Sequence, residues 1–183
     1  VLLAALEEES ERTFGPAVAR NFLENAWYSR WLARLPAYLD WQRAREAEGW
    51  YFEGAEQVAE CPYPLADGGE VKLYGRLDRV DRRADGGEAV LDYKSRGILP
   101  LRRQAADPDD VQLAVYTLLK GDSVVDAAYV ALDDAKVESA PLDDPAAAAV
   151  AQEERLLALF DAMHAGAPLP AHGGACGYCE MRG

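Results

Sequence analysis

Apolar side chains recur at helical spacing through the first fifty residues. This spacing predicts helices over residues 1–13 and 17–48, the second interrupted or kinked at Pro36. Large apolar residues at three- and four-residue spacing usually face a protein core. We therefore expect a buried stripe along the second helix that consists of Phe22, Trp27, Trp31, Leu35 and Tyr38.

From about Tyr51 the pattern changes to short runs of alternating polar and apolar residues. These runs predict strands over residues 57–62, 70–82 and 88–95. The segments between these three runs include residues 66–69 and 84–87, which both have the sequence Ala-Asp-Gly-Gly, typical of tight turns. The pattern therefore predicts three consecutive antiparallel strands.

Helix and strand signals alternate through the rest of the chain. They predict a helix over 108–120, a strand over 124–132 and an alanine-rich helix that starts at Asp143-Asp144-Pro145 and ends near Gly166. The order indicates an α/β fold, a mixed sheet flanked by helices with the core order αβββαβ.

Both ends of the chain look unlike natural termini. We therefore expect a single domain, 1–183, excised from a longer protein. Its parts are a helical region (1–50), a catalytic sheet core (51–142) and a C-terminal helix with a cysteine-containing tail (143–183).

The formal net charge of −13 argues at first sight against a nucleic-acid partner. However, nine of the nineteen basic residues lie between Lys72 and Arg103, a segment with only five acids. Either this segment forms a locally basic face, or it is a solvated strand edge, and charge alone slightly favours the edge.

No apolar run approaches the roughly 20 residues that cross a bilayer, and an odd count of three cysteines fits a reducing cytoplasm, so we expect a cytoplasmic protein without membrane contact.

Two acidic runs on the second and third predicted strands carry the candidate chemistry. Asp92 and Lys94 alternate with apolar neighbours and must share one face of their strand. Asp78 on the preceding strand lies across from Asp92 if the register is right. Two carboxylates beside one ammonium suit a divalent cation that polarises a phosphodiester. The plainer alternative is a surface salt bridge between Asp92 and Lys94.

Three runs taken together resemble the motif series of RecB/AddB-like nucleases of the PD-(D/E)xK type. They are residues 75–81 (Gly-Arg-Leu-Asp-Arg-Val-Asp), 91–95 (Leu-Asp-Tyr-Lys-Ser) and 112–116 (Gln-Leu-Ala-Val-Tyr). The resemblance implies a restriction-endonuclease-like fold, with Mg²⁺ or Mn²⁺ bound by Asp78, Asp92 and the main-chain carbonyl of Tyr93. It further implies that Lys94 is the catalytic lysine and that Gln112 and Tyr116 form the Gln-x-x-x-Tyr motif of the site.

Two features of that family are incomplete. The Gly-x-x-x-His motif that usually completes the metal shell is absent, since the histidines are His164 and His172, both near the C-terminus. We expect this motif to lie before Val1 in the longer protein. Without it, this fragment would have weak nuclease activity or none. Glu56 and Glu60 lie near the right part of the sheet without a register that makes either a ligand. Cys176 and Cys179 resemble the start of a 4Fe-4S signature that only the full-length protein would complete. Alternatively, they could bind zinc with His172, whereas Cys61 is interpreted as a structural cysteine.

The resemblance implies a metal-dependent exonuclease that acts on DNA in repair or recombination beside a helicase domain or subunit. The chain has no Gly-x-x-x-x-Gly-Lys-Ser/Thr loop, so a motor must lie elsewhere. A second hypothesis is a non-catalytic module that binds DNA ends or acts as a scaffold. The joint presence of the five candidate side chains favours the enzyme, because a scaffold has no need of that set.

Overall fold

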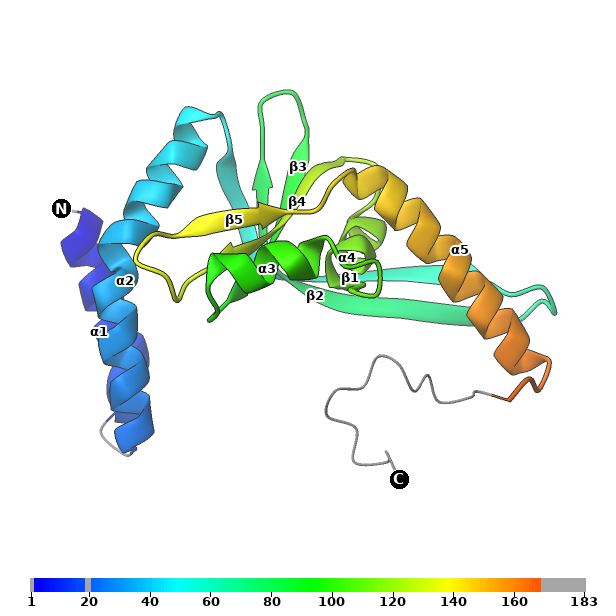
Figure 1. The fold of residues 1–183 in the computed structure, drawn as a ribbon, viewed down its shortest axis with the longest axis horizontal. Coiled ribbons are helices and arrows are strands. Elements are labelled where there is room, and N and C mark those ends of the chain that lie inside the picture. Colours follow the sequence, from blue (N-terminus) through cyan, green and yellow to red (C-terminus); the bar gives the residue numbers. More distant parts are fainter. Residues whose placement is uncertain (1, 19–20, 169–183) are drawn as a thin grey trace.

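The computed structural model describes residues 2–18 and 21–168 (Figure 1). Its helices are α1 (Leu2–Val18), α2 (Phe22–Ala47), α3 (Ile98–Ala105), α4 (Gln112–Lys120) and α5 (Pro145–His164). Its strands are β1 (Tyr51–Pro64), β2 (Glu70–Arg82), β3 (Glu88–Lys94), β4 (Val124–Ala131) and β5 (Glu138–Pro141). The predicted order αβββαβ is confirmed, and the sequence patterns missed α3 and β5, which are short.

One five-stranded sheet in the order β1-β2-β3-β4-β5 forms the centre of the fold. The strands β1, β2 and β3 are antiparallel neighbours, as predicted, whereas β3 and β4 are parallel. A parallel pair needs a connection that returns to the starting end of the sheet. The segment with α3 and α4 provides this connection and lies across one face of the sheet (Figure 1).

The two hairpin turns are built alike. Gly68 and Gly86 have φ angles of 85° and 90°, a left-handed backbone that glycine adopts without steric cost. In each turn the aspartate carboxylate accepts a hydrogen bond from the N–H two residues later, at 2.8 and 2.9 Å. Both predicted hairpins are present, although β1 begins at Tyr51 instead of residue 57.

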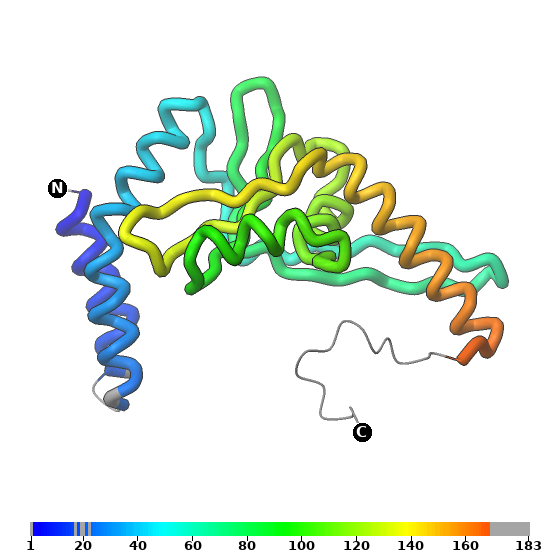
Figure 2. The backbone as a smooth tube through the Cα atoms, viewed as in Figure 1, coloured from blue at the N-terminus to red at the C-terminus, as the bar shows by residue number. Residues whose placement is uncertain are grey.

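Different helices cover the two faces of the sheet. The helices α3 and α4 pack on one face around a buried cluster that includes Leu77, Val80, Val90, Leu101, Leu113 and Tyr129. The helix α2 packs on the other face around Trp41, Leu91, Ala128, Val130 and Val137. Figure 2 shows α1 beside α2 at one end of the sheet and the β1–β2 hairpin extending toward the other.

The aromatic stripe on α2 is only partly buried, and the helix continues through Pro36. Leu35 is fully buried and Trp31 is half-buried, but Trp27 is 57% exposed. The prediction of a core position is wrong for Trp27, because the first half of α2 runs beyond the sheet beside α1 (Figure 2). Within the described ranges, no helix is long and apolar enough to cross a membrane.

The basic segment does not form a free cationic face. Arg79 is buried, and most of the other cations lie in ion pairs. These pairs are Lys72–Glu60, Arg76–Glu56, Arg82–Glu53, Arg82–Glu88, Arg83–Asp85 and Arg102–Glu138. The structure thus favours the solvated strand edge over the basic face.

Candidate active site

Two aspartates lie at the same level of the sheet on neighbouring strands. The strands β2 and β3 pair with Arg79 opposite Leu91, and the next position of this antiparallel register sets Asp78 opposite Asp92. The Asp78 carboxylate also accepts a hydrogen bond from the backbone N–H of Tyr93 at 3.1 Å. This register brings the two carboxylates together beside the end of β3.

The Asp92 carboxylate is 2% exposed and has two different oxygens. Oδ1 accepts a hydrogen bond from Gln112 Nε2 at 2.6 Å. Oδ2 is buried, and it lies 2.7 Å from Lys94 Nζ but forms no well-directed hydrogen bond with any described residue. Burial raises the pKa of Asp92, the Lys94 ammonium opposes this rise, and the charge of Asp78 adds to it.

Gln112 joins the other candidate side chains. Its Oε1 accepts a hydrogen bond from Lys94 Nζ at 2.8 Å, while its Nε2 donates to Asp92 and, at 3.1 Å, to the Tyr116 hydroxyl. Gln112 and Tyr116 share one face of α4 because residues four apart are neighbours on a helix. The opposite flank buries Leu113 and Ala114, which fixes α4 on the sheet.

A second group of polar side chains, which the sequence analysis missed, lies behind Lys94. The Lys94 ammonium is 5.4 Å from the centre of the Tyr129 ring on β4. The Tyr129 hydroxyl donates to Asp110, whose other oxygen accepts from Gln104 Nε2 at 2.6 Å. Tyr129 reads as an ordinary core residue in its apolar strand. The sequence signal that could have indicated this polar group is Asp110, an acid two residues before Gln112.

The other acids and histidine considered from the sequence are engaged elsewhere. Flanking pairs in the β1–β2 register put Glu56 across from Asp78, but its carboxylate pairs with Arg76 at 3.0 Å. Glu60 pairs with Lys72 at 3.3 Å. His164 lies 2.9 Å from Asp67 at the tip of the β1–β2 hairpin.

The sequence offered candidate metal ligands in the C-terminal tail and a third cysteine on β1. Cys176, Cys179 and His172 lie outside the described residues. Cys61 is a free, half-buried cysteine on β1, so it is less buried than the sequence interpretation assumed.

The residues at the end of β3 fit a hard divalent cation. In the described ranges there is no group of three or more histidine, cysteine, aspartate or glutamate side chains arranged as ligands. Asp78 and Asp92 nevertheless provide two carboxylates, one with a buried oxygen that lacks a well-directed hydrogen bond. Mg²⁺ is often held by one or two carboxylates and keeps several waters. A cation here would also relieve the repulsion between the two carboxylates.

Comparison with known proteins identifies the superfamily of the chain. No curated protein matches the chain. The solved structure of the protein SSO0001 is similar at 18% identity, with a TM-score of 0.48, over 97% of this chain and 76% of that one. The PD-(D/E)XK nuclease superfamily matches residues 1–183. The mixed sheet flanked by helices is consistent with a restriction-endonuclease-like fold, and the chain belongs to the PD-(D/E)XK nuclease superfamily.

Proposed function

We propose that this domain is a metal-dependent deoxyribonuclease that hydrolyses phosphodiester bonds at the end of β3. The observation that carries the proposal is the position of Asp92. Its buried carboxylate contacts both Lys94 and Gln112 and lies across from Asp78. Superfamily membership supports nuclease chemistry, and the two carboxylates support a divalent cation as its cofactor.

In the proposed mechanism Asp78, Asp92 and the main-chain carbonyl of Tyr93 hold Mg²⁺ or Mn²⁺. The cation, when bound, supplies Lewis-acid polarisation of the phosphodiester. The Lys94 ammonium stabilises the negative charge that develops on the phosphate oxygens. Gln112 keeps Lys94 and Asp92 in place through its two hydrogen bonds, and Tyr116 fixes the Gln112 amide.

We further propose the finer identity that the motif series suggests. The domain is a RecB/AddB-like exonuclease of DNA repair or recombination, and it works beside a helicase domain or subunit. In the full-length protein, Cys176 and Cys179 contribute to a 4Fe-4S cluster.

The first test is the metal requirement of DNA cleavage. We expect the intact protein that contains this domain to degrade end-labelled linear DNA in Mg²⁺ or Mn²⁺ and to lose this activity completely in EDTA. Gel analysis of the label and of closed circular DNA will separate exonuclease from endonuclease action. Binding without cleavage in either metal would contradict the enzymatic proposal.

A non-catalytic DNA-binding module is the second candidate function. It is favoured by one observation, the absence of a third acidic or histidine ligand beside Asp78 and Asp92 in the described part of the chain. The same assay distinguishes the two functions, because a non-catalytic module would bind end-labelled DNA in the presence of Mg²⁺ without shortening it.

Gln112→Ala is expected to reduce kcat by roughly 10- to 100-fold. This range corresponds to hydrogen bonds with charged groups, about 1.5–3 kcal/mol. Tyr116→Phe removes only the hydroxyl that Gln112 contacts, so its effect should be a few-fold. Tyr74→Phe, on an exposed side chain of the hairpin, is the matched control and should match the wild type. Equal rates for Gln112→Ala and wild type would exclude a positioning role.

A further inference from the structure

A cleft of about 280 Å³ lies between the two N-terminal helices and the strand that carries Lys94. Both helices and the segments after β3 and β4 contribute to it. Its lining consists of Phe14, Trp27, Arg30, Trp31 and Arg34 from the helices, and Ser95, Leu132 and Asp133 from the sheet side. This volume is near the lower limit of small-molecule pockets, about 300 Å³, and suits one planar group.

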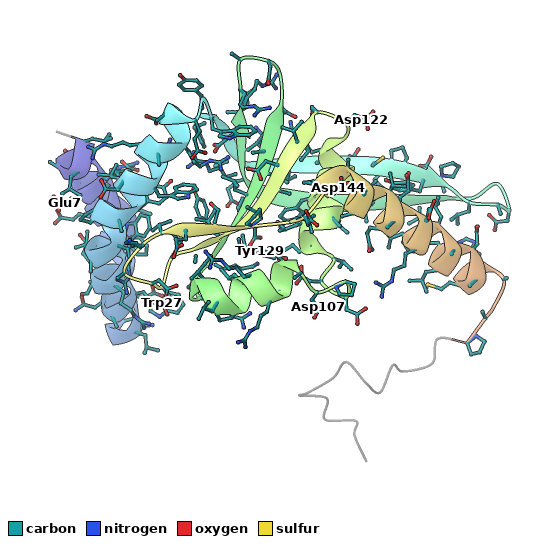
Figure 3. All side chains as sticks on the ribbon, turned by 45° about the horizontal axis from the view of Figure 1, so that its top comes forward. Glu7, Trp27, Asp107, Asp122, Tyr129 and Asp144 are labelled. Atoms are coloured by element: carbon teal, nitrogen blue, oxygen red, sulfur yellow. The ribbon has the colours of Figure 1, made fainter. Side chains whose placement is uncertain are left out.

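Two tryptophans on α2 give this cleft its aromatic character. The Trp31 indole is fixed, because its Nε1 donates at 2.8 Å to Oγ of Ser10, a buried residue of α1. Trp27 is 57% exposed, and Figure 3 shows it on α2 away from the centre of the sheet. The exposed Trp27 indole beside the fixed Trp31 indole provides a stacking surface for a planar group.

Arginines lie beside the aromatic surface in a chain whose net charge is −13. The Arg30 guanidinium is 5.7 Å from the centre of the Trp27 ring. Arg34 donates to the main-chain carbonyl of Asp133 at 2.9 Å, and the Asp133 side chain is the one acid of the lining. Aromatic rings with neighbouring guanidinium groups match a base attached to a phosphate backbone.

The cleft adjoins the candidate active site. Ser95, one of its lining residues, directly follows Lys94, and the Leu132 N–H donates to the Lys94 carbonyl at 2.9 Å. The cleft lies on the face of the sheet covered by α2, whereas the Asp92 side chain faces α4, and both lie at the same end of β3. The backbones of Ser95 and Asp92, three residues apart, are separated by at most roughly 10 Å, so a strand that passes round this end of the sheet reaches both. A nucleotide in the cleft is therefore close enough to belong to the same DNA strand as a phosphate at Asp92.

We propose that this cleft binds an unpaired nucleobase of single-stranded DNA next to the scissile phosphate. A base inside a duplex is already stacked on both faces and paired at its edge, so the indole surface selects single strands or frayed ends. The inference rests on the proposed nuclease function for the identity of the substrate. It goes beyond that function by naming the form of DNA that is bound and the residues that select it.

The test measures binding without cleavage. Fluorescence anisotropy in EDTA and low salt compares a labelled single-stranded oligothymidylate with an abasic strand of equal length. We expect Trp27→Ala to weaken oligothymidylate binding by at least about fivefold, the lower limit for loss of one stacked base. Trp27→Phe should restore most of the affinity. Tyr74→Ala, which removes an equally exposed aromatic residue from the hairpin, should leave it unchanged.

Each outcome bears on one proposal. Loss of oligothymidylate affinity in Trp27→Ala, with little change for the abasic strand, supports the base site even if no DNA is cleaved in Mg²⁺. Equal affinity of Trp27→Ala and wild type overturns the base site even if the wild type is an active nuclease. A wild type that binds both strands equally also overturns it. The base site is also overturned if Trp27→Ala changes the sedimentation of the protein and leaves DNA binding unchanged, because the cleft would then be a contact between copies of the chain.

Discussion

Replacement of Asp92 by asparagine is expected to abolish metal-dependent cleavage without loss of folding stability. Asparagine keeps the size of the side chain and an oxygen for the Gln112 amide, but it removes the charge that would bind the cation. Loss of a group that stabilises transition-state charge typically costs about 10²- to 10³-fold in kcat. We expect at least this reduction in single-turnover cleavage of end-labelled DNA at saturating protein.

The expected stability of this variant follows from the pKa of Asp92. Burial raises this pKa above the ordinary value of 3.8, so the folded protein holds the proton more tightly than the unfolded chain does. The stabilising contribution of the protonated carboxyl is present below pH 3.8 and is lost as pH rises through the folded-state pKa. At neutral pH the asparagine variant should therefore be as stable as the wild type or more stable.

This prediction is checked by measuring the free energy of unfolding in urea at a series of pH values from 3.5 to 7. Each unit of pKa difference between the folded and unfolded states corresponds to about 1.4 kcal/mol of this free energy. The Asp92→Asn variant should lose less stability than the wild type as pH rises through this range. Asp122→Asn, at an exposed position, is the control for a charge change alone. Cleavage by Asp92→Asn at the wild-type rate would show that this carboxylate does not bind the metal.

Local patterns in the sequence predicted the central part of the fold. Alternating residues and two Ala-Asp-Gly-Gly turns fix β1, β2 and β3 as antiparallel neighbours, and the register that follows sets Asp78 opposite Asp92. The spacing of Gln112 and Tyr116 placed both on one helix face, and they are hydrogen-bonded. These features depend on residues close in the chain, so local chemistry was enough.

Features that depend on distant contacts were not predictable. The exposure of Trp27 is set by how far α2 extends past the sheet, which no periodicity records. The contact of Lys94 with Tyr129 requires the parallel pairing of β3 and β4, whose connection includes the unpredicted α3. Ion pairs between β1 and β2 neutralise cations that the sequence suggested could form a basic face. The partners in these pairs lie far apart in the sequence. Charge counts along the chain could not reveal these pairs.

The largest expected loss of stability is for replacement of Asp81 by alanine. Asp81 is fully buried on β2 and accepts from two arginines, Arg45 Nε at 2.8 Å and Arg79 Nε at 2.6 Å. Both guanidinium groups are also buried, and they lie 5.7 and 5.3 Å from the centre of the Trp41 ring. Removal of the carboxylate leaves two buried cations without their shared partner, which costs about 3–5 kcal/mol.

This cost approaches the whole stability of many domains, about 5–15 kcal/mol, so Asp81→Ala should unfold at much lower urea concentration. Asp126→Ala is the matched control. Asp126 contacts the same Arg45, at 3.5 Å, but its side chain is 28% exposed, so its loss should cost less than about 1 kcal/mol.

A triple variant distinguishes a missing partner from a simple cavity. Replacement of Arg45 and Arg79 by methionine together with Asp81→Leu removes all three charges and keeps most of the volume. Because apolar groups can replace a buried ion network with little loss, the triple variant should recover much of the stability that Asp81→Ala loses. A triple variant no more stable than Asp81→Ala would show instead that these charges fix the packing of α2 on the sheet. Arg79 also donates to the Tyr38 and Tyr93 hydroxyls, so such a result would extend the role of the network to the strand that carries Asp92.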